Sequence, residues 1–355
     1  MILNKFKIKK TLLKNRVFIS PMCQYSSKNG NPSKWHYKHL LNLSSSGASM
    51  IILESTAIDK NGRISPADLC LYNNIHQKNL KKLFSFLKSK NDTKIGIQIS
   101  HSGRKGSSNI PWIKPNSPLE NKNSWQTYAP SPIARDKHWP IPKKLSIRDI
   151  GKLISRFKKS ALRAKKIGFD LLEIHMAHGY LLHQFFSPVS NKREDIYGGN
   201  LKNRSRVLLE VSKAVRKIWP ADKILGARIT GTDHLKNGLN VKDAIFLAKK
   251  LKEIGFDYIS VSSGGILPKT NMKQKEAFRS NISKKIKNKS KLITTTSGLI
   301  TKHETAINLI KRKNLDFITI ARTIVKDPGW IYQLAKKLKK NRMIPNQYQR
   351  IFTQK

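Results

Sequence analysis

Short apolar runs alternate with longer amphipathic stretches along almost the whole chain. Eight of the short runs, rich in Val, Ile and Leu, predict β-strands at 17–20, 50–54, 94–100, 171–175, 224–229, 258–262, 291–295 and 317–320. The run Met50-Ile51-Ile52-Leu53 is apolar at every position, which is typical of a strand buried on both faces. This pattern indicates a parallel sheet that is covered by helices.

The longer stretches repeat their apolar residues three and four positions apart, as amphipathic helices do. The clearest helix covers 147–167, where the face opposite the lysines carries Ile147, Ile150, Leu153, Ile154, Phe157, Ala161 and Ala164. Three helix starts carry N-capping pairs, namely Ser146 with Asp149, Asn240 with Asp243, and Thr301 with Glu304. Eight strand–helix units are what a closed barrel needs, so we expect an α/β fold with a single (β/α)8 TIM barrel over 1–355.

Two connections are much longer than a turn: 101–145, which contains seven prolines, and 176–201. They follow the third and fourth predicted strands. Both should therefore lie at the C-terminal end of the barrel, where active sites of this fold are built. A doubly wound nucleotide-binding fold is disfavoured because no two glycines are spaced G-x-G and no G-x-x-x-x-G-K-[ST] motif occurs.

The chain is strongly basic, with 70 Lys and Arg against 21 Asp and Glu and a formal net charge of +49. Such a charge favours contact with polyanions, but sequence-specific nucleic-acid binding needs more than charge. The lysines are spread over predicted helix faces, in pairs such as 158–159, 165–166, 249–250, 284–285 and 336–337. We interpret them as solvated surface and expect weak, salt-sensitive adhesion rather than a specific nucleic-acid partner.

Cysteine content and hydropathy exclude several classes of protein. Two cysteines, Cys23 and Cys70, can form neither a disulfide scaffold nor a Cys-based zinc or iron–sulfur cluster. No apolar run approaches the roughly 18 residues that a membrane-spanning helix needs. The basic segment 1–16 lacks the apolar core and cleavage site of a secretion signal. We expect a soluble protein of the reducing cytoplasm, without a membrane partner.

Two histidines and a tyrosine lie at the end of the fourth predicted strand. His175 ends that strand, His178 lies three residues further on, and Tyr180 follows. Two imidazole N–H groups can bind one carbonyl oxygen, and a phenol with a reference pKa near ~10 can donate a proton at neutral pH. The alternatives are structural histidines or a metal site that includes His183. We expect no metal, because the spacing lacks the HExxH form and has no obvious carboxylate partner.

Polar residues inside apolar runs mark further candidates. Gln98 lies on the third predicted strand and Arg228 on the fifth. A buried guanidinium needs an anionic partner, which is either a cofactor or a structural carboxylate. Arg322 follows the eighth strand, where barrels of this fold often hold a phosphate. A cysteine such as Cys23 can equally be a small buried apolar residue.

Taken together, the motifs resemble the old yellow enzyme family of flavin oxidoreductases. The matching segments, in matching order over residues 15–352, are Ser20-Pro21-Met22-Cys23-Gln24-Tyr25, Gln98-Ile99-Ser100-His101-Ser102-Gly103-Arg104, 175–183 (HMAHGYLLH), 186–188 with 191–199, and Ala321-Arg322. The Cys-containing first motif and the short length are similar to the bacterial NADPH dehydrogenase and xenobiotic reductase branch. The resemblance implies tightly bound FMN, NAD(P)H as reductant, and reduction of the C=C bond of α,β-unsaturated carbonyl or related electrophilic compounds.

The resemblance also assigns roles to residues. It implies that Tyr180 is the proton donor and that His175 and His178 hold the substrate oxygen. The substrate would further contact Tyr25, Met176 and Ala177. FMN would be bound by Ser20, Pro21, Met22, Cys23, Ala57, Gln98, Arg228, Gly298, Ala321 and Arg322, with Cys23 against the flavin and Arg322 on the phosphate.

The resemblance implies a homodimer or homotetramer in which the tail, 341–355, contacts a neighbouring subunit and Arg350 reaches the neighbour's active site. An exposed tail arginine is the alternative. The chain departs from the family at Ala321, where Gly is common, at Lys326, where close relatives have Arg, and at Met176, where Ala is usual.

Two other functions stay open from the sequence. One is a flavin barrel that reduces uridine in transfer RNA, although its added helical RNA-binding domain is not visible here. The other is a nucleic-acid-binding protein without enzymatic activity, which would leave the His, Tyr, Gln and Arg residues unexplained.

Overall fold

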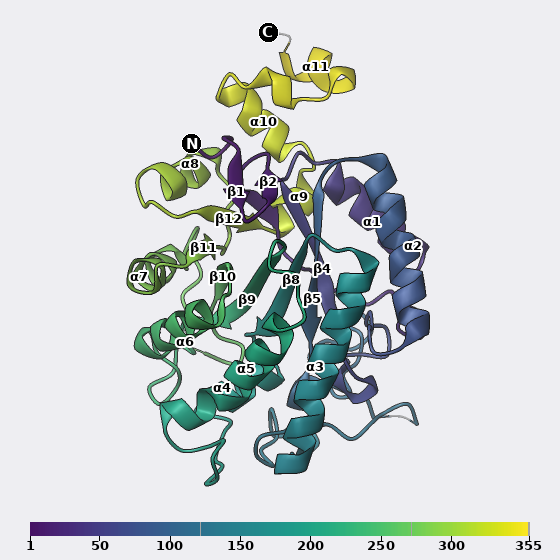
Figure 1. Cartoon of the computed structure of the whole chain (residues 1–355), viewed down its shortest axis with the longest axis vertical. Helices are drawn as coiled ribbons and strands as arrows, with labels where there is room; N and C mark the ends of the chain where they lie inside the picture. Colours follow the sequence, from purple (N-terminus) through teal and green to yellow (C-terminus); the bar gives the residue numbers. More distant parts are fainter. Residues whose placement is uncertain (121, 271, 354–355) are drawn as a thin grey trace.

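Eight parallel strands close into a barrel in the computed structural model, which describes residues 1–120, 122–270 and 272–353 (Figure 1). The strands are β3 (Val17–Ile19), β4 (Met50–Ala57), β5 (Lys94–Ser100), β8 (Leu171–Met176), β9 (Ile224–Thr230), β10 (Tyr258–Ser262), β11 (Ile293–Thr296) and β12 (Phe317–Ile320). Each strand pairs with the next in the chain, and β12 pairs with β3 to close the barrel. The predicted TIM barrel is confirmed, and only strand ends differ, as where 50–54 runs on to Ala57.

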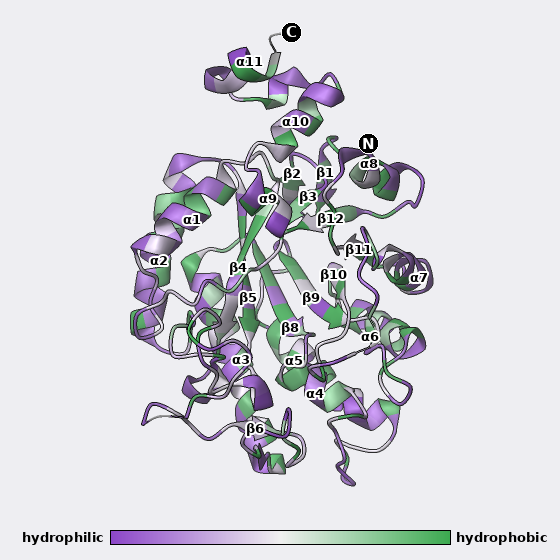
Figure 2. Ribbon diagram, turned by 180° about the vertical axis from the view of Figure 1, so that it is seen from behind, coloured by the Kyte–Doolittle hydropathy of each residue, from purple (hydrophilic) through white to green (hydrophobic). Residues whose placement is uncertain are grey.

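Helices cover the outside of the barrel. They are α1 (Lys34–Ser44), α2 (Asn74–Lys90), α3 (Ile147–Ile167), α5 (Leu201–Arg216), α6 (Val241–Ile254), α7 (Ser280–Ser290) and α8 (His303–Lys311). Figure 2 shows apolar strands inside and mixed helices around them. The main core cluster fills the space between the strands and the apolar helix faces. Of the ten residues in the five lysine pairs named above, nine are exposed and Lys250 is partly buried.

The ends of the helices test the capping predictions. Ser146 with Asp149 and Asn240 with Asp243 form capping boxes, as predicted. The prediction for Thr301 is wrong, because α8 begins at His303 and the Thr301 hydroxyl donates to Glu276 instead. Ile147, which the pattern placed on the apolar face, is 56 % exposed because it is the first residue of α3 and precedes the buried stripe.

A β-hairpin closes the end of the barrel opposite the long loops. Its strands β1 (Phe6–Ile8) and β2 (Thr11–Leu13) are antiparallel, and the sequence pattern did not predict them. Ile8 and Leu13 belong to a second buried cluster with side chains from the barrel strands, including Phe18 and Tyr258. The hairpin thus completes the packing of the barrel interior.

The two long connections carry short elements of their own. The connection after β5 contains the 3-10 turn η2 (Gly103–Lys105) and the short strands β6 (Tyr128–Ala129) and β7 (Lys143–Lys144), and the connection after β8 contains α4 (Leu181–Phe186). A 3-10 turn η1 (Lys60–Gly62) follows β4. Of these elements, β6 and α4 lie at the same end of the molecule, opposite the N-terminus (Figure 2).

The chain ends in a tail of short helices beyond the barrel. After α9 (Arg322–Lys326) come α10 (Trp330–Lys337), the 3-10 turn η3 (Asn341–Met343) and α11 (Asn346–Thr353). The tail projects at the end where the N-terminus lies, away from β6 and α4 (Figure 2). None of the helices in the described part of the chain is both long and apolar enough to cross a membrane.

Candidate active site

Three aromatic rings meet where β8 ends at the mouth of the barrel. We call His175, His178 and Tyr180 the ring cluster. The centroid of the His175 ring is 5.1 Å from that of His178 and 4.7 Å from that of Tyr180, and both pairs pack edge to face. His175 is part of β8, whereas His178 and Tyr180 lie in the turn before α4. The structure therefore brings together the three residues that the sequence proposed as catalytic.

Hydrogen bonds determine which imidazole nitrogens can donate. The N–H of Ala177 donates to His175 Nδ1 at 3.1 Å, so neutral His175 carries its proton on Nε2. That nitrogen lies 3.2 Å from His178 Nδ1. His178 Nε2 lies 2.5 Å from the hydroxyl of Ser262 on β10. When Ser262 donates to Nε2, His178 carries its proton on Nδ1, and the two neighbouring N–H groups can share one acceptor oxygen.

Burial sets the protonation states of the ring cluster. Desolvation lowers the pKa of His175 and His178 well below the usual value for histidine, and the positive charge of Arg228 lowers both further. Desolvation also raises the pKa of Tyr180 well above that of a free phenol. At neutral pH the cluster therefore holds two neutral imidazoles and one protonated phenol.

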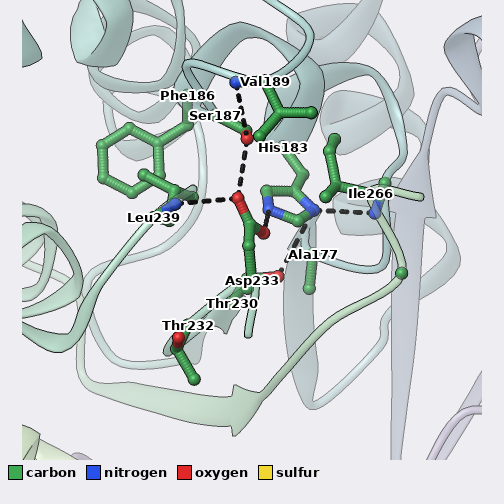
Figure 3. Close-up of polar contacts among 12 residues, drawn as sticks. Ala177, His183, Phe186, Ser187, Val189, Thr230, Thr232, Asp233, Leu239 and Ile266 are labelled. Atoms are coloured by element: carbon green, nitrogen blue, oxygen red, sulfur yellow. Dashed lines mark hydrogen bonds and ion pairs between the residues drawn. The ribbon is translucent and has the colours of Figure 1, made fainter. Parts of the chain in front are cut away.

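A buried histidine–aspartate pair supports the turn before α4, as Figure 3 shows. The N–H of Gly179 donates to His183 Nδ1 at 2.7 Å, and His183 Nε2–H donates to Asp233 Oδ1 at 2.9 Å. Asp233 Oδ2 accepts from the Ser187 hydroxyl at 2.7 Å and from the Leu239 N–H at 2.9 Å. His183 and Asp233 are both fully buried. The pair thus links the backbone of the turn to the loop that follows β9.

The same turn is held from its other side. Gly179 has a φ of +74°, and a Cβ at this position would collide with the carbonyl of Gly265. Gln184 Nε2 donates to the carbonyl of Gly179 at 2.6 Å, and Lys105 Nζ donates to the carbonyl of His178 at 2.7 Å. Side chains from η2 and α4 thus fix the backbone between His178 and Tyr180.

Asp233→Asn is expected to lower the free energy of unfolding by about 3 kcal/mol. An amide nitrogen placed toward Leu239 would face another N–H, and placed toward His183 it would reverse the proton arrangement that Gly179 requires. Urea unfolding measures the loss. Glu253→Gln, which removes one charge from an exposed pair with Lys250, is the control. A loss no larger than the control's would contradict this role of Asp233.

A second histidine–carboxylate pair supports the loop that carries Cys23 and Tyr25. His36 Nε2 lies 2.8 Å from Glu54 Oε1, and Glu54 Oε2 accepts from the N–H of Gln24. Burial raises the pKa of the Cys23 thiol and of the Tyr25 phenol, so both are protonated at neutral pH. A charge on Cys23 or Tyr25 would raise the pKa of the Tyr180 phenol further.

Five of the residues proposed to bind a cofactor line one cavity of about 260 Å³: Ser20, Arg228, Gly298, Ala321 and Arg322. It lies at the mouth ends of β3, β9, β11 and β12. Two further cations, Arg279 and Lys326, also line it. Arg279 was not among the residues predicted from the sequence, because the loop after β10 carries no recognisable motif.

The cavity is strongly positive. Within the described residues, none of its cations has a carboxylate within 4 Å. Arg228 Nη1 donates to the Ser20 hydroxyl at 3.0 Å, while its Nε is buried without a hydrogen-bond partner. Burial, Arg228 and Arg322 together lower the pKa of Arg279 to about 10. Such a cavity suits a ligand that carries negative charge.

A buried hydrogen-bond network lies beside Arg228 inside the barrel. Gln98 Nε2 donates to Glu173 Oε1, and the Tyr258 hydroxyl donates to Glu173 Oε2, both at 2.6 Å. Burial raises the pKa of Glu173, and the charge of Arg228 opposes that shift. Glu173 was not among the sequence candidates, although it is an acidic residue between the apolar residues Leu172 and Ile174 of a predicted strand.

The remaining sequence candidates occupy different places. Ala57 is buried at the end of β4, and Pro21 and Met22 are partly buried after β3. Met176, the last residue of β8, is buried in the main core cluster. Arg350 is exposed on α11, in the tail and far from the long loops (Figure 1). Among the described residues, no group of three or more His, Cys, Asp or Glu could hold a metal ion.

Comparison with known proteins gives a family and several relatives. The family model described as "NADH:flavin oxidoreductase / NADH oxidase family" matches residues 2–341. The chain is 36 % identical over 352 residues to an NADPH dehydrogenase of Geobacillus sp. (strain WCH70), covering 99 % of this chain and 98 % of that protein. It is also 36 % identical over 353 residues to an NADPH dehydrogenase of Listeria monocytogenes, covering 98 % of each.

Solved structures share the fold at lower sequence identity. Morphinone reductase in complex with tetrahydroNAD superposes with a TM-score of 0.77 at 20 % identity, over 96 % of this chain and 91 % of that one. A 2-naphthoyl-CoA reductase gives a TM-score of 0.85 at 21 % identity, over 95 % of this chain and 52 % of that one.

Proposed function

Because the chain belongs to the NADH:flavin oxidoreductase / NADH oxidase family, it is an FMN-dependent oxidoreductase with NAD(P)H as reductant, and we propose that it reduces the C=C bond of α,β-unsaturated carbonyl compounds. The observation that carries the proposal is the ring cluster, in which two neutral imidazoles and a protonated phenol meet at the barrel mouth. Relatives named NADPH dehydrogenase support the reductant.

The positive cavity fits FMN. Its cations lack acidic partners in the described part of the chain, and the orphaned Arg228 Nε suits an anionic or electron-rich ring edge. Arg322 and Arg279 would hold the phosphate, because a guanidinium matches phosphate oxygens in pairs. Arg228, Gln98 and Cys23 would contact the flavin ring. Ala321 replaces a common glycine, but its backbone still lines the cavity.

The ring cluster would act on the substrate. His175 Nε2–H and His178 Nδ1–H would hold the carbonyl oxygen and stabilise the negative charge that develops there. Tyr25 would approach the same oxygen from the other side. When bound, FMN supplies the hydride that the alkene accepts, with NAD(P)H as its source. Tyr180 would then give its proton to the α-carbon, which a phenol of raised pKa can do because it stays protonated.

Arg322→Gln is expected to weaken FMN binding by about 10- to 100-fold, because a charge-assisted bond to phosphate is replaced by a neutral one. Quenching of FMN fluorescence by the apoprotein measures the affinity. Lys302→Gln, at an exposed lysine two residues after Ile300 of the cavity wall, is the control for net charge. Equal affinities for the two variants would remove Arg322 from the phosphate site.

Product analysis tests the proposed reaction. Anaerobic enzyme with NADPH is given either 2-cyclohexenone or unmodified transfer RNA. We expect one cyclohexanone formed per NADPH consumed and no dihydrouridine. Reduction of uridine without reduction of cyclohexenone would favour the RNA-directed function, and NADPH oxidation with neither product would reject both.

We further propose that the tail joins subunits of a homo-oligomer and that Arg350 reaches a neighbouring active site. Tyr332 packs against Tyr348 and Phe352, with ring centroids 6.2 and 5.9 Å apart, which leaves Ile351 75 % exposed on the outer face of α11. Tyr348, three positions before Ile351 on the same helix, is 46 % exposed, and neighbouring exposed apolar side chains suit an interface between copies of the chain.

Ile351→Glu is therefore expected to convert the oligomer to a monomer, because a buried carboxylate would lack a partner at that interface. Light scattering coupled to gel filtration measures the mass. Ile147→Glu, at the exposed start of α3, is the control. Wild-type protein that is already monomeric, or an Ile351→Glu oligomer, would contradict the role of the tail.

A further inference from the structure

A second group of cations lies beside the ring cluster, and its members are not among the residues that line the FMN cavity. We call Arg104, Lys105 and Arg135 the mouth cations. Lys105 Nζ lies 5.1 Å from the centroid of the Tyr180 ring, and it donates to the carbonyls of His178 at 2.7 Å and Gly265 at 3.5 Å. A cation is thus placed directly beside the proposed proton donor.

Arg104 connects Lys105 to the segment that carries Arg135. Its guanidinium is 1 % exposed and donates to the carbonyls of Ile133, Ala134 and Ile266 at 3.2, 3.3 and 2.9 Å, while its Nε has no partner in the described structure. Ala134 directly precedes Arg135. The position of Arg135 is therefore tied to a buried side chain rather than left to a free loop.

Arg135 lies next to the loop that packs on Tyr25. Its guanidinium stacks on Trp139 at 4.5 Å, and Nη2 lies 3.4 Å from Asn116 Oδ1. Asn116 belongs to the loop whose Trp112 packs on Tyr25, with ring centroids 6.1 Å apart. Burial lowers the pKa of Arg135, and an ionised phenol at Tyr180 or Tyr25 would oppose that shift.

The mouth cations lack acidic partners. In the parts of the chain that the structure describes, none of the three has a carboxylate within 4 Å. Among the acids near them, Asp68 accepts from the N–H of Ile64 and from Ser65, and Glu54 lies 2.8 Å from His36. Asp136, the neighbour of Arg135 in the chain, is exposed, accepts from the N–H of Lys137 and partly offsets the lowering of the Arg135 pKa. Burial and the other two cations lower the pKa of Lys105 to about 7, so an incoming anion would relieve a repulsion.

We propose that the mouth cations select substrates that carry an anionic group, such as a carboxylate, next to the electrophilic alkene. This inference rests on the proposed function, since it assumes that the ring cluster holds the carbonyl oxygen. Neutral polar substrates would leave Lys105 and Arg135 without a partner of opposite charge, whereas a carboxylate would receive charge-assisted hydrogen bonds from them. Arg135 would be the specificity-determining residue of the pair.

Ligand binding tests the proposal without turnover. The FMN-loaded enzyme is titrated at pH 6.5 with 4-hydroxybenzoate and with 4-hydroxybenzamide, its neutral isostere, and the perturbation of flavin absorbance gives each affinity. We expect the acid to bind about 10-fold more tightly than the amide at low salt, with the preference shrinking as salt rises. The amide group makes the phenol more acidic than the carboxylate does, so ionisation of the phenol cannot produce this preference.

Two variants separate local from bulk charge. Arg135→Gln should lower the affinity for the acid by about 5- to 10-fold and leave the amide within about two-fold. Lys137→Gln, at an exposed lysine on the same segment, should change neither, although it alters the net charge equally. Lys105→Met gives a second test of the pair, with thermal unfolding as the check on folding.

The outcomes distinguish a failure of the anion selectivity from a failure of the proposed reaction. Tight binding of the amide with no preference for the acid would overturn the inference alone, as would a preference that survives both Arg135→Gln and Lys105→Met. Equal losses in Arg135→Gln and Lys137→Gln would assign the preference to net charge. If neither phenol perturbs the flavin and no enone is reduced, the proposed function fails. In turnover, kcat/KM should likewise be higher for 4-oxopent-2-enoate than for its amide, and Arg135→Gln should reduce that preference.

Discussion

Tyr180→Phe is expected to slow the reduction of 2-cyclohexenone by about 100- to 1000-fold while leaving reduction of the enzyme by NADPH within about two-fold of wild type. The phenylalanine keeps the ring contact with His175 and removes only the hydroxyl. The two half-reactions separate because the proton is needed at the α-carbon of the alkene and not in the transfer from NADPH. The steric shape of the site is preserved, so substrate affinity should change little.

Anaerobic stopped-flow absorbance measures the two halves in turn. The enzyme is first reduced with NADPH and then mixed with cyclohexenone, and the flavin band is followed in each step. Tyr128→Phe, which removes a partly buried hydroxyl on β6, is the matched control. If Tyr180→Phe slowed both halves equally, the tyrosine would be acting on the shape of the site rather than as a proton donor.

His178→Leu is expected to reduce the rate of the same enone step by about 100-fold, because it removes one of two donors to the developing oxyanion. Binding of 4-hydroxybenzamide should weaken in parallel, since the phenol oxygen would use the same donors. His175→Leu should have a similar effect. The double variant should cost less than the product of the two single losses, because the two imidazole nitrogens lie 3.2 Å apart and would bind the same oxygen.

Ser262→Ala refines the same prediction. Without the hydroxyl, His178 no longer has a partner that fixes its proton on Nδ1, so the enone step should slow by only about 3- to 10-fold. Unchanged phenol binding and rates in both His178→Leu and His175→Leu would contradict the assignment of the oxygen site. A full loss in Ser262→Ala would instead make the serine a direct substrate contact.

The barrel could be predicted from the sequence because its strands are buried on both faces. A run such as Met50–Leu53 is apolar at every position, which indicates a buried strand. Helix α3 has a continuous apolar stripe and a capping box at Ser146. The hairpin β1–β2 escaped prediction because each strand has only three residues, too few to establish an alternation. The predicted N-cap at Thr301 is wrong because the Thr301 hydroxyl donates to Glu276, a tertiary contact that the local sequence pattern does not reveal.

The site was predictable where a short motif carries several polar residues and not where a single residue arrives from a distant loop. His175, His178 and Tyr180 lie within six positions, and the structure brings them together. Ser262 and Arg279 reach the site from β10 and the loop after it, and nothing local marks them as functional. Asp233 lies fifty positions from His183, so only the folded barrel reveals their pairing.

The measurement that tests the central claim most directly is an anaerobic visible spectrum of the purified protein. We predict a yellow protein whose flavin band bleaches with one equivalent of NADPH and returns fully when one equivalent of 2-cyclohexenone is added, with cyclohexanone as the product. A protein that stays colourless after incubation with FMN, or a bleached band that cyclohexenone leaves unchanged, would contradict the account.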